Sequence, residues 1–202
     1  GKTLNCFIMK AEESMRLFYL FLISILFYNC TGSKILNIAE QNPALLIAME
    51  DSLLHKGRTE SLTSALSLSH NKIGLKEFTK KNYNKALKHY LSSKEFNENN
   101  IIANFHILII NGIILAKTGK KDNLWTAIQN YNKASQINPN SGIPHYYIGM
   151  AYQKIGDKDF DLILEAFESA LALDLEPDLR ERTELAYDKE KSREKRLNDF
   201  WK

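Results

Sequence analysis

The chain has 202 residues, of which 44% are hydrophobic and 25% are charged, and its formal net charge is +3. These values are typical of a folded globular protein and leave enough chain for one sizeable domain. The basic and acidic residues are nearly balanced and form no basic stripe, which argues against a nucleic-acid partner.

An apolar run stands near the N-terminus, in LFYLFLISILFYNC, residues 17–30. It is shorter than the roughly 20 apolar residues that a membrane-spanning helix needs, and it lacks the polar stripe of a half-buried helix. Met15 and Arg16 precede it and Cys30 ends it, which is the layout of a secretory signal. The run therefore predicts a signal peptide, with an uncleaved signal anchor or a buried helix as alternatives.

The end of this run resembles the signal peptide of a bacterial lipoprotein. Phe27 suits the position three places before the cysteine, whereas Tyr28 and Asn29 depart from the small residues that usually stand there. The resemblance implies that residues 1–29 are removed, although residues 1–14 suit a signal poorly. It also implies acylation of Cys30, a membrane-anchored protein of the bacterial cell envelope, and a domain facing the periplasm or the exterior.

Residues 30–66 are expected to form a tether and an N-terminal helix. The helix is predicted over NPALLIAMEDSLLHKG, residues 42–57, because Pro43 suits a helix start and Gly57 suits a helix end. A further helix is expected to begin in TESLTSALSLSH, which leads into the segment described next.

A pattern with a period of 37 or 38 residues runs from 67 to 177, as the spacing of Gly74, Gly112 and Gly149 shows. HYYIGMAY, residues 145–152, contains the spacing aromatic-like, aliphatic, glycine, tyrosine. AIQNYNKASQINP, residues 127–139, contains Ala, Tyr, Ala and Pro at the spacing A-x-x-x-F-x-x-A-x-x-x-x-P. Small residues let two antiparallel helices approach closely, and the aromatic residues Tyr90, Tyr131 and Phe167 would fill the gap to the next pair.

These segments resemble the tetratricopeptide repeat (TPR), whose period is 34 residues. The resemblance implies an all-α fold, an α-α superhelical solenoid of about three helix pairs over 67–100, 101–140 and 141–177. The longer period predicts short insertions in the turns KTGKKDNLW and KIGDKDFD. A non-repeating helical bundle is the alternative. Residues 178–202 hold eight basic and seven acidic residues and are expected to form the polar capping helix of such an array.

In TPR proteins the first helix of each pair lines the concave face, and this register predicts a partner-binding groove. Its residues are Asn71, Leu75 and Phe78 from the first repeat, Ile109, Ile113 and Lys117 from the second, and Tyr146, Met150 and Lys154 from the third. Some TPR co-chaperones grip a C-terminal carboxylate with cationic side chains of the groove. The matching positions here, Asn71, Leu75, Ile110, Ile143 and Tyr147, carry no cation, which disfavours that ligand.

The sequence shows no catalytic motif, so neither an enzyme nor a cofactor is expected. DKDFD, residues 157–161, has the alternating aspartates of a calcium loop, but Leu162 stands where the glycine is required. The five histidines show no H-E-x-x-H spacing, and no metal is expected.

The function predicted from these features is a membrane-tethered adaptor or scaffold that presents its groove to a protein partner of unknown identity. A structural subunit of a large envelope machine for secretion or motility, and a transporter-associated carrier of a small apolar ligand, are alternatives. The groove could also be filled by the protein's own N-terminal helix or by its C-terminal LNDFW.

Overall fold

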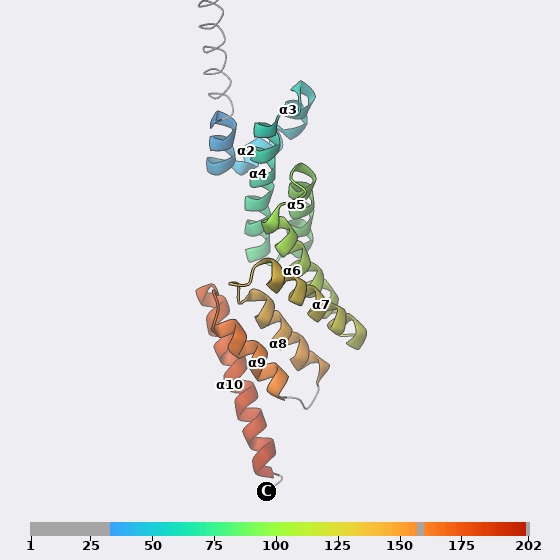
Figure 1. Ribbon diagram of the computed structural model, residues 1–202, viewed down its shortest axis with the longest axis vertical. Helices are drawn as coiled ribbons and strands as arrows, with labels where there is room; N and C mark the ends of the chain where they lie inside the picture. The colour runs from blue at the N-terminus through green and yellow to red at the C-terminus, as the bar shows by residue number, and fades with distance from the viewer. Residues whose placement is uncertain (1–32, 157–159, 201–202) are drawn as a thin grey trace, which may run out of the picture. The chain divides into compact units, whose positions relative to one another are not determined.

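The computed structural model describes residues 33–156 and 160–200 (Figure 1). Within these ranges the chain forms helices and no strand, which confirms the all-α prediction, and one isolated parallel bridge joins Ser141 to Asp174. The helices after the helical segment 33–41 are α2 (Pro43–Ala48), α3 (Glu50–Lys56), α4 (Glu60–Thr79), α5 (Tyr83–Phe96), α6 (Ile101–Lys117), α7 (Lys121–Ile137), α8 (Ile143–Ile155), α9 (Phe160–Leu171) and α10 (Pro177–Phe200). The described residues fall into two compact units, one ending at Ile73 and the other beginning at Gly74.

In the first unit, the helix expected over 42–57 is two short helices. Asn42 caps α2, since its Oδ1 accepts a hydrogen bond of 3.2 Å from the Leu45 amide, and Pro43 begins the helix as expected. The helix breaks at Met49 and resumes as α3, which Gly57 ends with a φ of 137°. The first-unit part of α4 is held to α3 by His70, whose Nε2 lies 2.9 Å from a Glu50 carboxylate oxygen.

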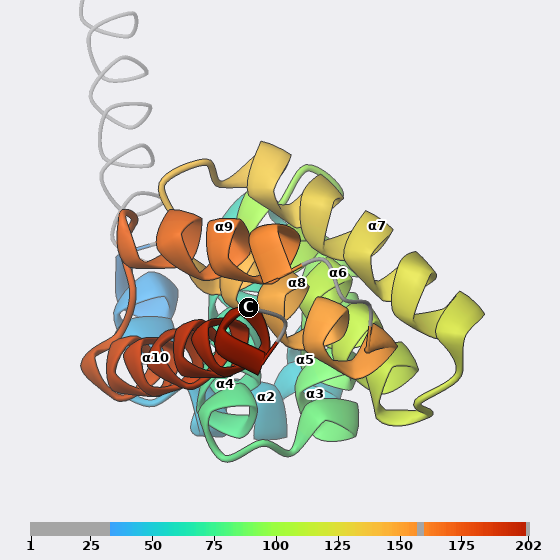
Figure 2. The ribbon, with the colours of Figure 1, turned by 90° about the horizontal axis from the view of Figure 1, so that it is seen from below.

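In the second unit, successive helices pack against one another from α5 through α10, as Figures 1 and 2 show for the chain from green to red. The apolar helix α6 packs against α5, α7 and α8, so it is covered on more than one face, as its composition predicts. Its N-terminal residues Ile101 and Ile102 are nevertheless 65% and 53% exposed.

The repeating glycines allow the two helices of each pair to approach closely. A Cβ atom added to Gly112 would lie 2.3 Å from the Tyr131 ring, and one added to Gly149 would lie 2.6 Å from the Phe167 ring. Gly74 faces Tyr90 in the same way, at 3.0 Å. The three glycine–aromatic contacts join α4 to α5, α6 to α7 and α8 to α9, so the sequence period is also a period of packing.

The aromatic residues also reach the next helix pair, as predicted. Tyr90 stacks on His106 of α6 with ring centroids 4.6 Å apart, and Tyr131 stacks on Tyr147 of α8 at 5.4 Å. Each ring is therefore held between the glycine of its own pair and an aromatic ring of the following pair.

The predicted insertion in KTGKKDNLW is wrong. Only three residues, 118–120, link α6 to α7, and each of these helices has 17 residues, compared with 14 in α5 and 13 in α8. The long period in this part of the chain therefore comes from longer helices. The second turn, KIGDKDFD, includes residues 157–159, which lie outside the described residues, as does most of the possible calcium loop.

The last helix, α10, packs against α9 and is fixed to it by polar contacts. Both terminal nitrogens of Arg180 donate to carbonyls near the end of α9, to Leu171 at 2.8 Å and Leu173 at 2.9 Å. Glu190 is buried and accepts hydrogen bonds from Gln153 of α8 at 3.0 Å and from Arg193 at 3.1 Å. Arg180 thus satisfies the carbonyls that the end of α9 leaves unpaired.

Candidate functional site: a groove with a tyrosine pocket

The second unit contains two adjoining hollows that share Tyr83 and Tyr147. The wide hollow has a volume of about 850 Å³, and the smaller tyrosine pocket has a volume of about 170 Å³. The tyrosine pocket is lined by Tyr83, Ile113, Ala116, Lys117, Tyr131, Tyr146, Tyr147, Met150, Ala151 and Lys154. The wide hollow is lined by the end of α4, the start of α6, the α7–α8 connection and the first turns of α10. Because the two hollows share residues, they form one groove across α6 and α8.

Most of the groove positions predicted from the repeat register lie in these hollows. Five line the tyrosine pocket: Ile113, Lys117, Tyr146, Met150 and Lys154. Leu75 and Phe78 line the wide hollow.

Two predicted groove positions lie elsewhere. Ile109 is 0% exposed and belongs to the core, so it cannot touch a partner. Asn71 is buried and belongs to the unit that ends at Ile73. Ile113 itself has only 5% of its surface exposed and serves the core as well as the pocket wall.

The tyrosine pocket takes its shape from a cluster of stacked rings. Tyr147 stacks on Tyr131 and meets Tyr146 edge-on, with centroids 5.1 Å apart. Burial, together with the neighbouring Tyr83, raises the pKa of Tyr147 and of Tyr131 above the ordinary value of a phenol. These rings are neutral at physiological pH and offer a flat, apolar surface with hydroxyl groups at its edge.

The predicted groove residues do not include Tyr83, Tyr131 or Tyr147, although Tyr147 is one of the positions that match the co-chaperone clamp. Tyr131 was expected only as a spacer between helix pairs, and Tyr83 lies outside the repeat pattern, at the first residue of α5. Tyr147 stands directly after the predicted Tyr146, so an aromatic pair in one helix turn was the available signal.

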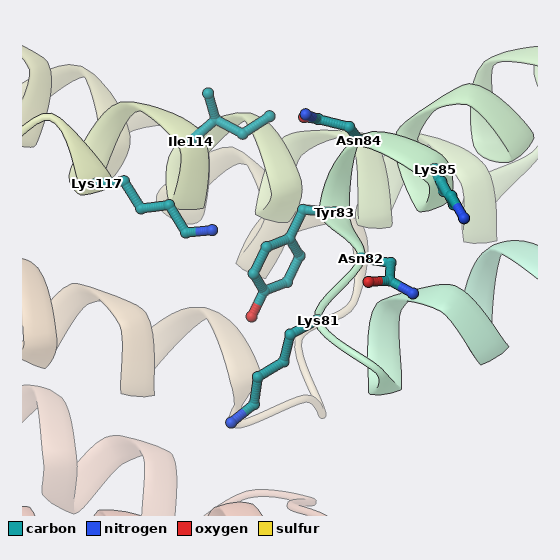
Figure 3. A pocket seen from close by; sticks show the side chains of 7 residues that line it. All are labelled: Lys81, Asn82, Tyr83, Asn84, Lys85, Ile114 and Lys117. Atoms are coloured by element: carbon teal, nitrogen blue, oxygen red, sulfur yellow. The ribbon is translucent and has the colours of Figure 1, made fainter.

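Lysines surround Tyr83 at one end of the groove, where Figure 3 shows the ring between the side chains of Lys81 and Lys117. The Lys117 ammonium lies 4.6 Å from the centroid of the Tyr83 ring, a cation–π contact. Lys154 donates from Nζ to the Ala116 carbonyl at 3.0 Å, which ties α8 to α6 beside the pocket.

The wide hollow has an apolar floor and a charged far edge. Leu75, Ile101 and Ile102 are exposed large apolar side chains of its lining. At the α10 edge stand Glu176 and an ion pair between Arg182 and Asp178, with a nitrogen–oxygen distance of 3.1 Å. The groove therefore runs from a basic end to an end of mixed charge.

His106 forms part of the wall of the wide hollow, between Phe78, Tyr90 and Phe105. Burial lowers its pKa from 6.5 to about 4, so the ring is neutral at physiological pH. Its Nδ1 is buried and has no hydrogen-bond partner among the described residues. His106 is a packing residue of the groove wall.

The described part of the C-terminal LNDFW segment does not fill the groove. Phe200 is 78% exposed, and residues 197–200 line neither hollow. Trp201 lies outside the described residues. Within residues 74–156 and 160–200, no segment fills the groove.

Two kinds of feature are absent from residues 33–156 and 160–200. No helix there has the length and apolarity required to traverse a bilayer, and no three His, Cys, Asp or Glu side chains gather there as a metal site would require. Cys30 lies outside these ranges.

Comparison with known protein families matches part of the chain. The family model described as a TPR repeat matches residues 120–156, which comprise α7 and α8, the second helix of one predicted repeat and the first of the next. No curated protein matches the chain significantly. The family match supports the tetratricopeptide interpretation for this segment of the chain.

Proposed function

We propose that this chain is an adaptor whose groove holds a segment of a partner protein. The observation that carries the proposal is the open groove across α6 and α8, with exposed apolar side chains on its floor and lysines at its rim. A hollow with a mainly apolar exposed lining is a candidate interaction surface. The TPR match over α7 and α8 supports the same conclusion, since arrays of such repeats form extended concave binding surfaces.

The shape of the groove favours a protein segment over a small apolar ligand. Sites for small molecules usually enclose about 300–1,000 Å³ and bury most of the ligand. The tyrosine pocket, at about 170 Å³, is smaller than that. The wide hollow is large but open to solvent along the surface, which suits an extended chain or a helix.

Met150→Glu is expected to abolish partner binding while leaving the fold intact. Met150 is half-buried in the tyrosine pocket, so a carboxylate there would be desolvated by an apolar ligand, whereas in the free protein it can reach water. Crosslinked pull-downs from native membranes would measure the partners, and circular dichroism would measure helix content. Ile113→Glu is a poorer test, because Ile113 is part of the core.

The matched control is Gln129→Glu, an exposed position on α7 that lines neither hollow. It adds the same charge and should keep every partner. An unchanged set of partners for Met150→Glu, in a protein that is still folded, would contradict the proposed function.

We further propose that the adaptor is tethered to a membrane of the bacterial cell envelope through an acylated Cys30. The apolar run before Cys30 and its likeness to a lipoprotein signal support this proposal. One acyl chain binds a membrane only marginally, so stable anchoring requires the several chains that such lipoproteins carry.

Cys30→Ala is expected to remove both fatty-acid labelling and membrane fractionation when the full chain is produced in bacteria. Cys6→Ala is the control, because it removes the only other thiol and should be labelled like the unmodified protein. Equal labelling of the Cys30→Ala protein and the unmodified protein would reject the anchor.

A further inference from the structure

Three lysines line the adjoining hollows around Tyr83, and none of them has a carboxylate partner among the described residues. Lys81, Lys117 and Lys154 line the two hollows or their shared edge. Within the described residues, none of the three forms an ion pair, although Lys80, next to Lys81, pairs with Glu77. Positive charge is therefore available to a ligand around Tyr83.

Two of the three side chains are held in place by contacts with the protein. Lys117 rests on the Tyr83 ring, and Lys154 is bound to the Ala116 carbonyl. Positions fixed before binding lower the entropy cost of forming ion pairs with a ligand.

Lys81 occupies a backbone conformation that favours glycine. Its φ is 62°, in the left-handed region, and it is the one non-glycine residue with positive φ among the described residues. Strained positions of this kind cluster at ligand-binding sites. The turn between α4 and α5 thus carries a lysine where glycine would cost less, and that lysine lines the wide hollow.

The chemistry of the tyrosine pocket selects the kind of ligand. Four tyrosine rings could in principle form a cage for a cationic group. Here Lys117 already occupies the face of Tyr83 and Lys154 stands at the rim, so a second cation would be repelled. An uncharged, large apolar side chain fits the pocket of about 170 Å³ better.

Resting on the proposed function, we propose that the groove recognises an acidic segment of a partner protein that carries a large apolar side chain. One large apolar side chain enters the tyrosine pocket, and neighbouring Asp or Glu carboxylates bind Lys81, Lys117 and Lys154. At the α10 edge Asp178 is already paired with Arg182 and Glu176 adds a negative charge, so carboxylates of the segment are better placed beside the lysines.

A selection of random peptides on the full chain, in detergent, tests this specificity. Enriched peptides should contain Phe, Trp, Leu or Met next to Asp or Glu, and their affinity should fall as salt is raised. The double variant Lys117→Glu, Lys154→Glu should weaken the best peptide by about tenfold or more, because each ion pair is lost and replaced by repulsion.

Lys81→Gln and Lys85→Gln form a matched pair. Both remove one charge from α4–α5, but Lys85 points away from Tyr83 in Figure 3. Only Lys81→Gln should weaken the peptide. Lys81→Gly should weaken it equally and also raise the melting temperature, since glycine adopts a positive φ without strain.

The results of these experiments distinguish failure of the acidic specificity from failure of the proposed groove-binding function. Some selected peptides could lose binding to Met150→Glu and yet carry no excess of acidic residues, or bind the Lys117→Glu, Lys154→Glu variant unchanged. Either result would overturn the acidic specificity alone. If no selected peptide is sensitive to Met150→Glu, the groove is not the binding site and both proposals are overturned.

Discussion

Because of His106, the native protein is expected to lose about 3 kcal/mol of its free energy of unfolding as the pH falls from 6.5 to about 4. The His106→Phe variant should not show this loss. Burial holds the pKa of His106 near 4 in the folded protein, whereas the unfolded chain takes up this proton near pH 6.5. As the pH falls through this window, the unfolded state binds the proton first and the folded state loses stability. Phenylalanine takes up no proton and keeps an aromatic ring between Tyr90 and Phe105.

Urea unfolding of the two proteins at pH 7.5 and pH 4.5 measures the difference. The relevant quantity is the difference in unfolding free energy between the two proteins, compared at the two pH values, because carboxylates titrate in both proteins. Phenylalanine also removes a buried Nδ1 that lacks a partner among the described residues, so the variant should be at least as stable at pH 7.5. His145→Phe, at a half-buried histidine, should have a smaller effect. An equal acid-induced loss in the native protein and in His106→Phe would show that His106 is not buried as described.

Gly112→Leu is expected to destabilise the second unit by about 3 kcal/mol, at the upper end of overpacking costs. The first atom of any side chain at this position would lie 2.3 Å from the Tyr131 ring, which is itself stacked on Tyr147. The ring cannot withdraw without disturbing the tyrosine pocket. The same variant should therefore also weaken partner binding.

Gly74→Ala is the matched control. The added Cβ would lie 3.0 Å from the Tyr90 ring, a contact that a small shift can relieve. Within a helix, alanine is also more favourable than glycine by about 1 kcal/mol. Its stability should change little, and thermal unfolding would rank the two variants. Similar melting temperatures for Gly112→Leu and the native protein would contradict the packing of α6 on α7.

The helix pairs could be predicted from the sequence because their main contact is encoded by single residues at fixed spacing. A glycine on one helix and an aromatic residue on the next are visible as letters, and the structure pairs Gly112 with Tyr131 and Gly149 with Phe167. The helix ends could be predicted as well, because Pro139 follows Asn138 at the end of α7 and Gly156 ends α8.

The face of a long helix was harder to predict. Ile109 and Lys117 were assigned to one surface, but residues eight apart on an α-helix differ by about 80° in direction. Lys117 therefore stands on the rim while Ile109 turns into the core. In α6, apolar on nearly all sides, composition offers no polar stripe to fix the rotation.

Contacts that depend on tertiary placement had no signal in the sequence. Arg180 binds the carbonyls near the end of α9, and no local pattern in the sequence indicates this contact. Lys81 likewise joins the groove only through the packing of the α4–α5 turn, whereas the repeat register predicts Lys117 and Lys154 there.

Site-specific photocrosslinking in living cells tests the central claim, that the groove holds a partner protein, most directly. A photoreactive residue would be placed at Met150, inside the tyrosine pocket, or at Gln129, on the exposed face of α7. If the groove holds a partner, position 150 should give a discrete adduct that an excess of a groove-binding peptide removes, and position 129 should give no such adduct. Adducts from position 129 alone, or adducts from position 150 that the peptide leaves unchanged, would contradict the claim.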